Sequence, residues 1–103
     1  MKDFGQMQKM LKAAKEMQDK LQRELTELRV EGTSGGGMVT LVMDGQKTPL
    51  SLRIDPEVVN RDDVDMLQDL VLAAFRDAAA KVDEHLSQKL GSLGAGLKIP
   101  GLF

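Results

Sequence analysis

Three short apolar runs, separated by glycine-rich turns, occupy residues 30–54, which read VEGTSGGGMVTLVMDGQKTPLSLRI. Gly35, Gly36 and Gly37 separate the first run from the second, and Asp44-Gly45 separates the second from the third. Glycine clusters and Asp-Gly pairs between apolar runs are strong signals for tight turns between strands. The pattern predicts a three-stranded antiparallel sheet with strands near residues 30–34, 38–43 and 48–54.

Alternating residues in the second and third strands indicate a sheet with one apolar face. Pro49 cannot donate a ladder hydrogen bond and is therefore expected at an edge or at the start of a strand. Three strands with a short edge bury little surface by themselves, so we expect two copies to associate through the sheet region. The predicted dimer interface consists of Val39, Leu41, Met43, Leu50 and Leu52.

Residues 4–28 are predicted to form a long helix, because apolar residues recur there at intervals of three and four. This apolar seam comprises Met7, Met10, Ala14, Met17, Leu21 and Leu28, widened by Phe4, Leu11 and Leu25. At about 1.5 Å per residue the helix is about 37 Å long, more than the width of a small domain. Part of it is expected to project or to be covered by a partner.

A set of basic side chains is predicted on the opposite face of this helix. Placed at about 100° per residue, the arc away from the seam holds Lys2, Lys9, Lys12, Lys20 and Arg23, which we call the basic stripe. One interpretation is a solvated face crossed by ion pairs four residues apart, such as Lys12 with Glu16. The other is a surface that contacts a polyanion.

The net charge of the chain does not decide whether the basic stripe is a solvated face or a surface that contacts a polyanion. The formal charge of the chain is -2, which argues against a globally basic nucleic-acid binder. The charge is unevenly distributed, however, since residues 1–29 carry seven basic and five acidic side chains. The helix that holds the basic stripe is therefore positive, and the rest of the chain is negative.

A second long helix is predicted over residues 63–90 from the spacing of its apolar residues. Its broad apolar face comprises Val64, Leu67, Val71, Ala74, Phe75, Ala78, Val82 and Leu86. Asp55-Pro56 is expected to open a short turn, and Asp62 is expected to cap the helix. Gly91 is expected to end it. One domain is thus predicted over residues 1–90, followed by a glycine-rich flexible tail over 91–103; docking of the tail on an apolar groove is the alternative, through Leu97, Ile99, Leu102 and Phe103.

Several chemistries have little support in this sequence. The glycines at 35–37 are followed by Met38 and Val39 instead of the Lys and Ser/Thr of a phosphate loop. His85 is the only histidine and cysteine is absent, so neither a catalytic triad nor a zinc site is expected. No enzymatic activity, metal, cofactor or small-molecule substrate is predicted.

Length and hydropathy predict a single soluble domain. A chain of 103 residues corresponds to one domain. Its N-terminus lacks the apolar region of a signal peptide, and no run approaches the roughly 20 apolar residues of a membrane span. A cytoplasmic location without membrane association is expected, and the absence of cysteine is compatible with it.

Four segments, taken together, resemble the YbaB/EbfC family of bacterial nucleoid-associated proteins. They are QMQKMLKAAKEMQDKLQREL, VEGTSGGGMV, LQDLVLAAFRDAAAKV and GLKIPGLF, and they cover nearly the whole chain in order. The resemblance implies an α+β fold of the order α-β-β-β-α. It also implies a homodimer whose sheets form a central body and whose long helices project as arms.

The same resemblance implies a function. A homodimer of this family is expected to bind double-stranded DNA with low sequence specificity and to affect nucleoid organisation and gene expression. The basic stripes of both copies would then meet phosphates, which give salt-dependent affinity and little sequence information. The Asp and Glu residues of the second helix would repel DNA unless they face away from it.

Two other functions stay open on the sequence. A prefoldin-like chaperone subunit also consists of a helix, a hairpin and a helix with apolar seams. Against this, the helices here are only a few heptads long and have broad apolar faces. The second alternative is a protein-interaction module or adaptor for which DNA binding is incidental.

Overall fold

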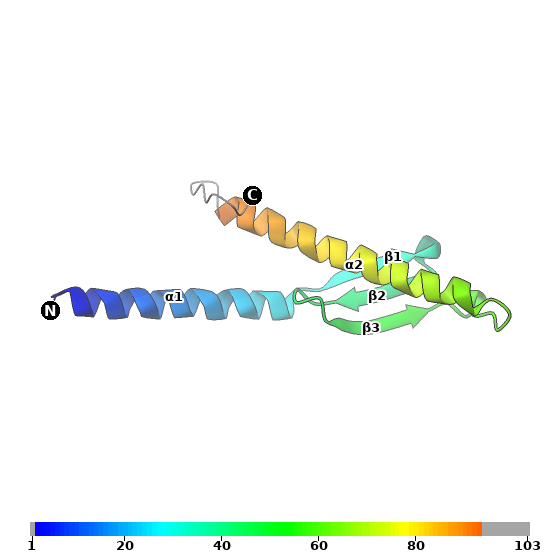
Figure 1. Cartoon of the computed structure of the whole chain (residues 1–103), viewed down its shortest axis with the longest axis horizontal. Helices are drawn as coiled ribbons and strands as arrows, with labels where there is room; N and C mark the ends of the chain where they lie inside the picture. Colours follow the sequence, from blue (N-terminus) through cyan, green and yellow to red (C-terminus); the bar gives the residue numbers. More distant parts are fainter. Residues whose placement is uncertain (1, 94–103) are drawn as a thin grey trace.

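The structure is a computed structural model that describes residues 2–93, and it confirms the α-β-β-β-α order. Figure 1 shows an elongated molecule of 74 × 24 × 16 Å, with a sheet and one helix forming a body from which the other helix extends. The elements in chain order are α1 (Lys2–Glu27), β1 (Val30–Ser34), the short 3-10 turn η1 (Gly35–Gly37), β2 (Val39–Met43), β3 (Pro49–Ile54), the 3-10 turn η2 (Pro56–Val58) and α2 (Val64–Leu93).

The sheet is an antiparallel meander with the strand order β1-β2-β3. At the first turn, Gly35, Gly36 and Gly37 all have positive φ, which glycine adopts without a steric penalty. At the second turn, the Asp44 carboxylate accepts hydrogen bonds from the backbone N–H groups of Gln46 and Thr48, at 2.8 and 3.0 Å. Both turn signals in the sequence therefore correspond to turns.

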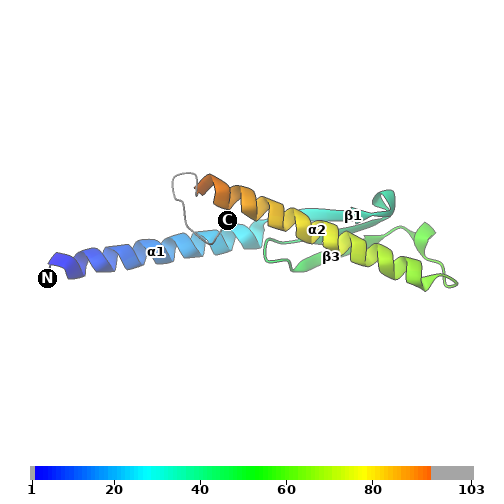
Figure 2. The same cartoon turned by 45° about the horizontal axis from the view of Figure 1, so that its top comes forward.

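Helix α2 covers one face of the sheet and forms the core with it. It lies diagonally across β1 and β2 in both Figure 1 and Figure 2, while β3 lies at the edge. Small residues on α2 allow this close packing. The buried core consists of Val39, Leu41 and Met43 from β2 and Ala74, Ala78 and Val82 from α2.

This packing corrects part of the predicted dimer interface. Val39, Leu41 and Met43 do lie on one face, but they are 0%, 4% and 0% exposed beneath α2 of the same chain. Side chains without exposed surface have none to offer to a second copy. The apolar face predicted for a partner is thus filled, over β2, by the chain's own second helix.

β1 approaches α2 more closely than any side chain would permit. A Cβ atom on Gly32 would lie 2.1 Å from the Ala74 carbonyl oxygen and 2.4 Å from the Ala78 backbone nitrogen. Polar contacts fix the same strand to the helix. The Ser34 hydroxyl donates to the Leu70 carbonyl at 2.6 Å, and the Lys81 ammonium donates to the Glu31 carbonyl at 2.7 Å.

Asp77 of α2 makes the third polar link to β1. Its carboxylate accepts a hydrogen bond from the Thr33 backbone N–H at 2.9 Å and pairs with Lys81 at 3.2 Å. These two contacts, the first being the larger effect, hold the pKa of Asp77 below its ordinary value of 3.8. The charged carboxylate is therefore stabilised in the folded state relative to the unfolded state.

The substitution Asp77→Asn tests this link through its pH dependence. Because the folded-state pKa is lowered, the contribution is present above the unfolded pKa and is lost as pH falls through the folded pKa. We expect the wild type to be more stable than Asp77→Asn above about pH 5, with the difference shrinking toward zero in stronger acid. Urea unfolding at several pH values measures it. A difference that persists unchanged in acid would contradict the link.

The ends of α2 differ from those predicted. Asp55 caps η2 as expected, accepting from the Glu57 N–H, but Asp63 and not Asp62 caps α2, accepting from the Met66 N–H at 3.2 Å. Helix α2 also continues through Gly91, which does not have the positive φ of a helix-ending glycine. Of the predicted tail, residues 91–93 thus belong to α2, and residues 94–103 lie outside the described part.

Candidate nucleic-acid interface

Helix α1 is an arm attached to the body only near its C-terminal end (Figure 1). The Gly45 N–H, in the turn between β2 and β3, donates to the Leu25 carbonyl at 2.8 Å. Lys89 of α2 forms an ion pair with Glu24. Residues 3–20 of α1 are exposed along their whole length, as expected for a helix longer than the domain.

The basic stripe lies on this arm. Lys9, Lys12, Lys20 and Arg23 are all exposed, whereas the side chain of Lys2 lies outside the described part. From Lys9 to Arg23 the stripe extends about 21 Å along the helix axis. Glu16 and Glu27 share this face, so the stripe is predominantly and not purely basic.

The ion pairs that would make the stripe an ordinary solvated face are not formed. Among the described side chains, the salt bridges join Lys47 to Asp83, Lys81 to Asp77 and Lys89 to Glu24, and none includes a member of the stripe. Lys12 therefore does not pair with Glu16, as one interpretation of the sequence required. The charges of the stripe are available to a partner.

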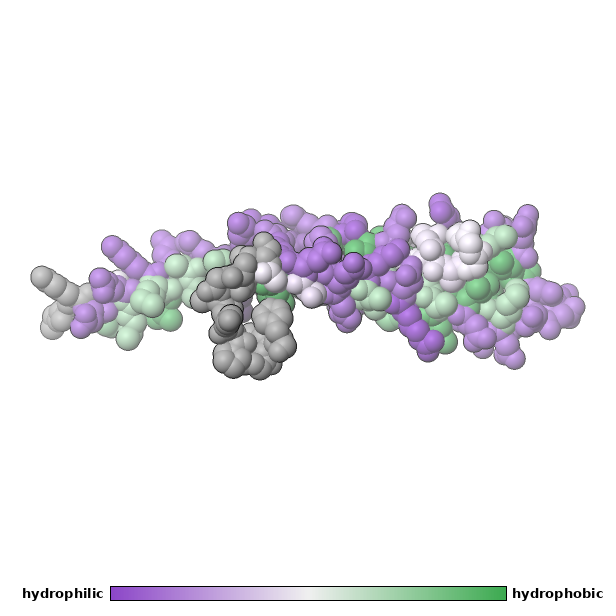
Figure 3. Space-filling view, turned by 90° about the horizontal axis from the view of Figure 1, so that it is seen from above, coloured by the Kyte–Doolittle hydropathy of each residue, from purple (hydrophilic) through white to green (hydrophobic). Residues whose placement is uncertain are grey.

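The apolar seam of α1 is uncovered as well. Figure 3 shows hydrophobic residues beside hydrophilic ones along the arm. The most exposed members are Phe4, Met7, Met10, Leu11 and Met17, which are 58% to 72% exposed. An apolar surface of this kind in a protein chain marks an interaction site. The arm thus presents one basic face and one apolar face.

A second apolar surface lies beside β3, where α2 does not cover the sheet. Leu50 and Leu52, the other two predicted interface residues, are 46% and 47% exposed. A groove of about 470 Å³ opens between β3 and α2. Its lining residues are Ile54, Leu67, Gln68, Val71 and Leu72, and we call it the β3 groove.

Sequence reasoning missed the α2 side of this surface. Leu72 lines the β3 groove and is 52% exposed, and Phe75, on the broad apolar face of α2, is 38% exposed. The signal was the width of that face, which exceeds what a three-stranded sheet can cover. Leu50 also departs from the predicted period of two, because a bulge pairs Val42 with Ser51 and Met43 with Pro49 and so leaves Leu50 outside the regular pairing.

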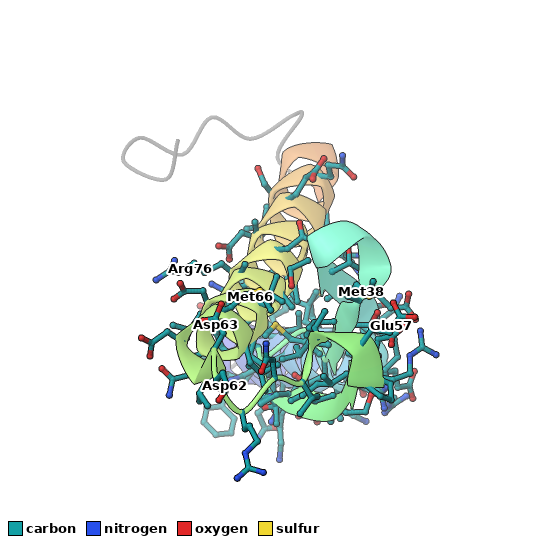
Figure 4. The ribbon with its side chains drawn as sticks, turned by 90° about the vertical axis from the view of Figure 1, so that its right-hand side faces the viewer. Met38, Glu57, Asp62, Asp63, Met66 and Arg76 are labelled. Carbon is teal, nitrogen blue, oxygen red and sulfur yellow. The ribbon has the colours of Figure 1, made fainter. Side chains whose placement is uncertain are left out.

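Several of the acidic residues outside the arm lie at the far end of the body or on α2. Figure 4 views the end of the molecule opposite the N-terminus and shows Glu57, Asp62 and Asp63 there. On α2, Asp77 and Asp83 each pair with a lysine, Lys81 and Lys47 respectively. The acidic charge of α2 that would repel DNA is therefore partly neutralised by these two lysines.

Other kinds of site are not evident in the described part of the chain. Residues 2–93 contain no group of three or more His, Asp or Glu side chains placed to hold a metal ion. His85 lies in an apolar groove between α1 and α2, without a nucleophile beside it. Within the same residues, no helix is long and apolar enough to cross a membrane.

Comparison with known proteins identifies relatives along the full chain. The model of the YbaB/EbfC DNA-binding family matches residues 1–97. A nucleoid-associated protein of Dictyoglomus thermophilum is 46% identical over 104 residues, covering 100% of both chains. Nucleoid-associated protein GK0018 of Geobacillus kaustophilus is 53% identical over 103 residues, covering 97% of this chain and 95% of the relative.

A solved structure has the same fold. The crystal structure of uncharacterized protein HP0035 from Helicobacter pylori matches with a TM-score of 0.72 and 23% sequence identity. The match covers 87% of this chain and 95% of that one. The arrangement of two helices around a three-stranded antiparallel sheet is thus shared with an experimentally determined structure.

Proposed function

This chain belongs to the YbaB/EbfC DNA-binding family, and from that membership we propose that it binds double-stranded DNA as a homodimer with low sequence specificity. Its relatives bear the name nucleoid-associated protein. The proposed role is the organisation of the nucleoid in the bacterial cytoplasm, with effects on gene expression. The observation that carries the proposal is the basic stripe on a projecting helix, where Lys9, Lys12, Lys20 and Arg23 take part in none of the salt bridges among the described side chains.

The β3 groove supports the proposed dimer. Leu52 and Ile54 on the strand and Leu67, Val71 and Leu72 on the helix form an apolar surface at the free edge of the sheet. Contact with a second copy would bury this surface and protect the edge strand. In such a dimer, the interface would use Leu50 and Leu52 of the residues first predicted, without the three buried residues of β2.

Leu52→Asp tests the proposed interface. Because Leu52 is 47% exposed in one chain, an aspartate there can be solvated in the monomer. In a dimer it would be a buried unpaired charge, which costs at least about 3 kcal/mol and raises the dissociation constant more than about 100-fold. Light scattering at micromolar concentration should give the monomer mass. Ser51→Asp, on the neighbouring residue and the other sheet face, should remain dimeric; a dimeric Leu52→Asp protein would rule out this interface.

The proposed contacts of the arm with DNA are electrostatic. Two copies would bring Lys9, Lys12, Lys20 and Arg23 from each chain to one duplex, where they would neutralise phosphates and release counterions. Phosphate contacts position a protein on DNA without identifying its sequence. The chain also has only three aromatic residues, so base stacking of single strands is disfavoured.

A mobility shift on several unrelated duplexes at two salt concentrations tests the proposed function. If six or more phosphates are contacted, affinity should fall about 1,000-fold or more between about 50 and about 200 mM salt. Unrelated duplexes should bind with similar affinities. A preference of about 1,000-fold or more for one duplex is typical of specific recognition and would contradict low specificity. Absence of binding at low salt would reject the function.

One observation favours a second candidate function. The exposed apolar seam of α1 resembles what a chaperone arm would present to an unfolded client. Helix α2, however, packs on the sheet through Ala74, Ala78 and Val82, and only its last turns lie beside the base of α1 (Figure 1). Suppression of client aggregation by a hexamer that does not shift DNA would favour the chaperone; a dimer that shifts DNA would favour the nucleoid-associated role.

A further inference from the structure

A second apolar groove lies where α1 joins the body, between the base of α1 and the end of α2. It is lined by Leu21, Leu25 and Leu28 from the α1 side and by His85, Leu86 and Leu90 from α2, and we call it the arm groove. The Glu24–Lys89 ion pair bridges the two sides at its rim. The arm groove is therefore a space between the base of the arm and the last turns of α2.

The arm groove is large enough to take whole side chains. Its volume is about 230 Å³, whereas an apolar cavity of about 150 Å³ in another protein binds a benzene ring. Leu90, at the end of the groove nearest the end of α2, is 52% exposed. Covering this surface with apolar side chains would be favourable by the hydrophobic effect.

The continuation of the chain starts at this groove. Helix α2 ends at Leu93, three residues after Leu90. Residues 94–103, GAGLKIPGLF, follow directly and contain four large apolar side chains, at Leu97, Ile99, Leu102 and Phe103. Gly94 and Gly96 come first and can adopt the positive φ needed for a sharp reversal. The apolar composition of residues 94–103 and their start beside the arm groove both suit a segment that folds back onto that groove.

Residues 94–103 are long enough to turn back from Leu93 and reach the arm groove. Returning from Leu93 to the level of Leu86 requires about 10 Å along the helix axis. Ten residues in extended conformation span up to about 33 Å. Three residues for the turn still leave enough chain to reach Leu86 and to cross to the α1 side.

We propose that residues 97–103 dock in the arm groove of their own chain, with Leu97, Ile99, Leu102 and Phe103 supplying the missing apolar contacts. A segment tethered beside its site has an effective concentration in the millimolar range. It therefore outcompetes the tail of a second copy at micromolar protein concentration. The docked segment ties Leu21, Leu25 and Leu28 to α2 and so fixes the angle between the arm and the body.

Paramagnetic broadening tests the proposal, and the absence of cysteine makes the labelling site unique. A nitroxide is attached to the full chain through Gly101→Cys, and methyl NMR signals of Leu21, Leu25 and Leu86 are recorded. Docking predicts loss of these signals when spin label and isotope are on the same chain. It predicts their retention when spin-labelled chains are mixed with isotope-labelled chains. A label at Asp62→Cys, at the opposite end of the body, should leave the signals intact.

Three results would overturn the proposal. Broadening in the mixed sample would assign the groove to the tail of a second copy, and no broadening in either sample would mean that the tail does not dock. The double substitution Leu97→Ser/Ile99→Ser, added to Gly101→Cys, should restore the methyl signals, whereas Lys98→Ser should not. Signals that stay broadened in the double variant would show that apolar docking is not the cause. Circular dichroism checks that both variants remain folded.

Discussion

Reversing the charge of Lys9, Lys12 and Arg23 together is expected to lower the affinity for duplex DNA by at least about 100-fold, and so to abolish the mobility shift at moderate salt. All three side chains are exposed on α1, outside the core and outside the described ion pairs. In the proposed dimer each substitution occurs twice on one duplex, replacing attraction to phosphate by repulsion. The folded state should be unaffected, because no buried contact is removed.

The matched control reverses three basic residues on the body. Arg53, Arg61 and Arg76 are also exposed, and their substitution by Glu changes the net charge by the same amount. If the arm is the contact surface, this control should bind DNA much more tightly than the arm variant. Equal losses in the two variants would indicate a dependence on net charge alone. Unchanged binding by a dimeric arm variant would reject the basic stripe as the DNA surface.

Gly32→Ala is expected to give the largest loss of stability of any methyl addition to the body. The new Cβ would lie 2.1 Å from the Ala74 carbonyl oxygen, 2.4 Å from the Ala78 nitrogen and 2.6 Å from the Ala78 Cβ. Two of these atoms are helix backbone, so a side-chain rotation cannot relieve the contact. The strand and helix must separate, which opens the core; we expect a loss of about 3 kcal/mol or more in unfolding free energy.

Thermal and urea unfolding measure this effect, and two variants make it specific. Gly5→Ala adds a methyl group to α1 where nothing lies within 4 Å, and it should be neutral or slightly stabilising. Adding Ala78→Gly to Gly32→Ala removes the contact with the Ala78 Cβ but leaves both backbone contacts. It should therefore fail to restore stability. Full rescue, or a Gly32→Ala protein as stable as the wild type, would contradict the close approach of β1 and α2.

Local signals in the sequence were sufficient to predict the order of the helices and strands. The glycines at 35–37 and Asp44-Gly45 predicted both turns, since positive φ and Asp side-chain caps are local requirements. The three-and-four spacing predicted both helices. Their ends were less certain, because a single exposed Gly91 costs a helix only about 1 kcal/mol and the preceding turns carry α2 through it.

What covers each apolar face could not be predicted from the same signals. The alternation of apolar residues along β2 indicated that Val39, Leu41 and Met43 share one face of the sheet. It could not indicate that α2 of the same chain covers that face. The residues that make this packing possible are far apart in the sequence: Gly32 on β1 lies directly against the small residues Ala74 and Ala78 on α2. Such pairing depends on the tertiary crossing of helix and sheet, which no local pattern encodes.

The basic stripe illustrates the same limit for the functional surface. Periodicity placed Lys9, Lys12, Lys20 and Arg23 on one face, but spacing alone allowed Lys12 to pair with Glu16. Whether α1 is packed on the body or projects from it decides how much of that face is free. Because the arm is held only near Leu25 and Glu24, its charges remain accessible.

The exposed seam of α1 and the β3 groove both require a second copy if the proposed architecture is right, so molar mass is the decisive quantity. Elution volume cannot supply it, because a single chain measuring 74 × 24 × 16 Å already migrates as a larger globular protein would. Light scattering of the purified protein at micromolar concentration, without DNA, measures mass independently of shape. We predict twice the chain mass of 11.3 kDa; a stable species of one chain mass would contradict the dimer and the paired arms that depend on it.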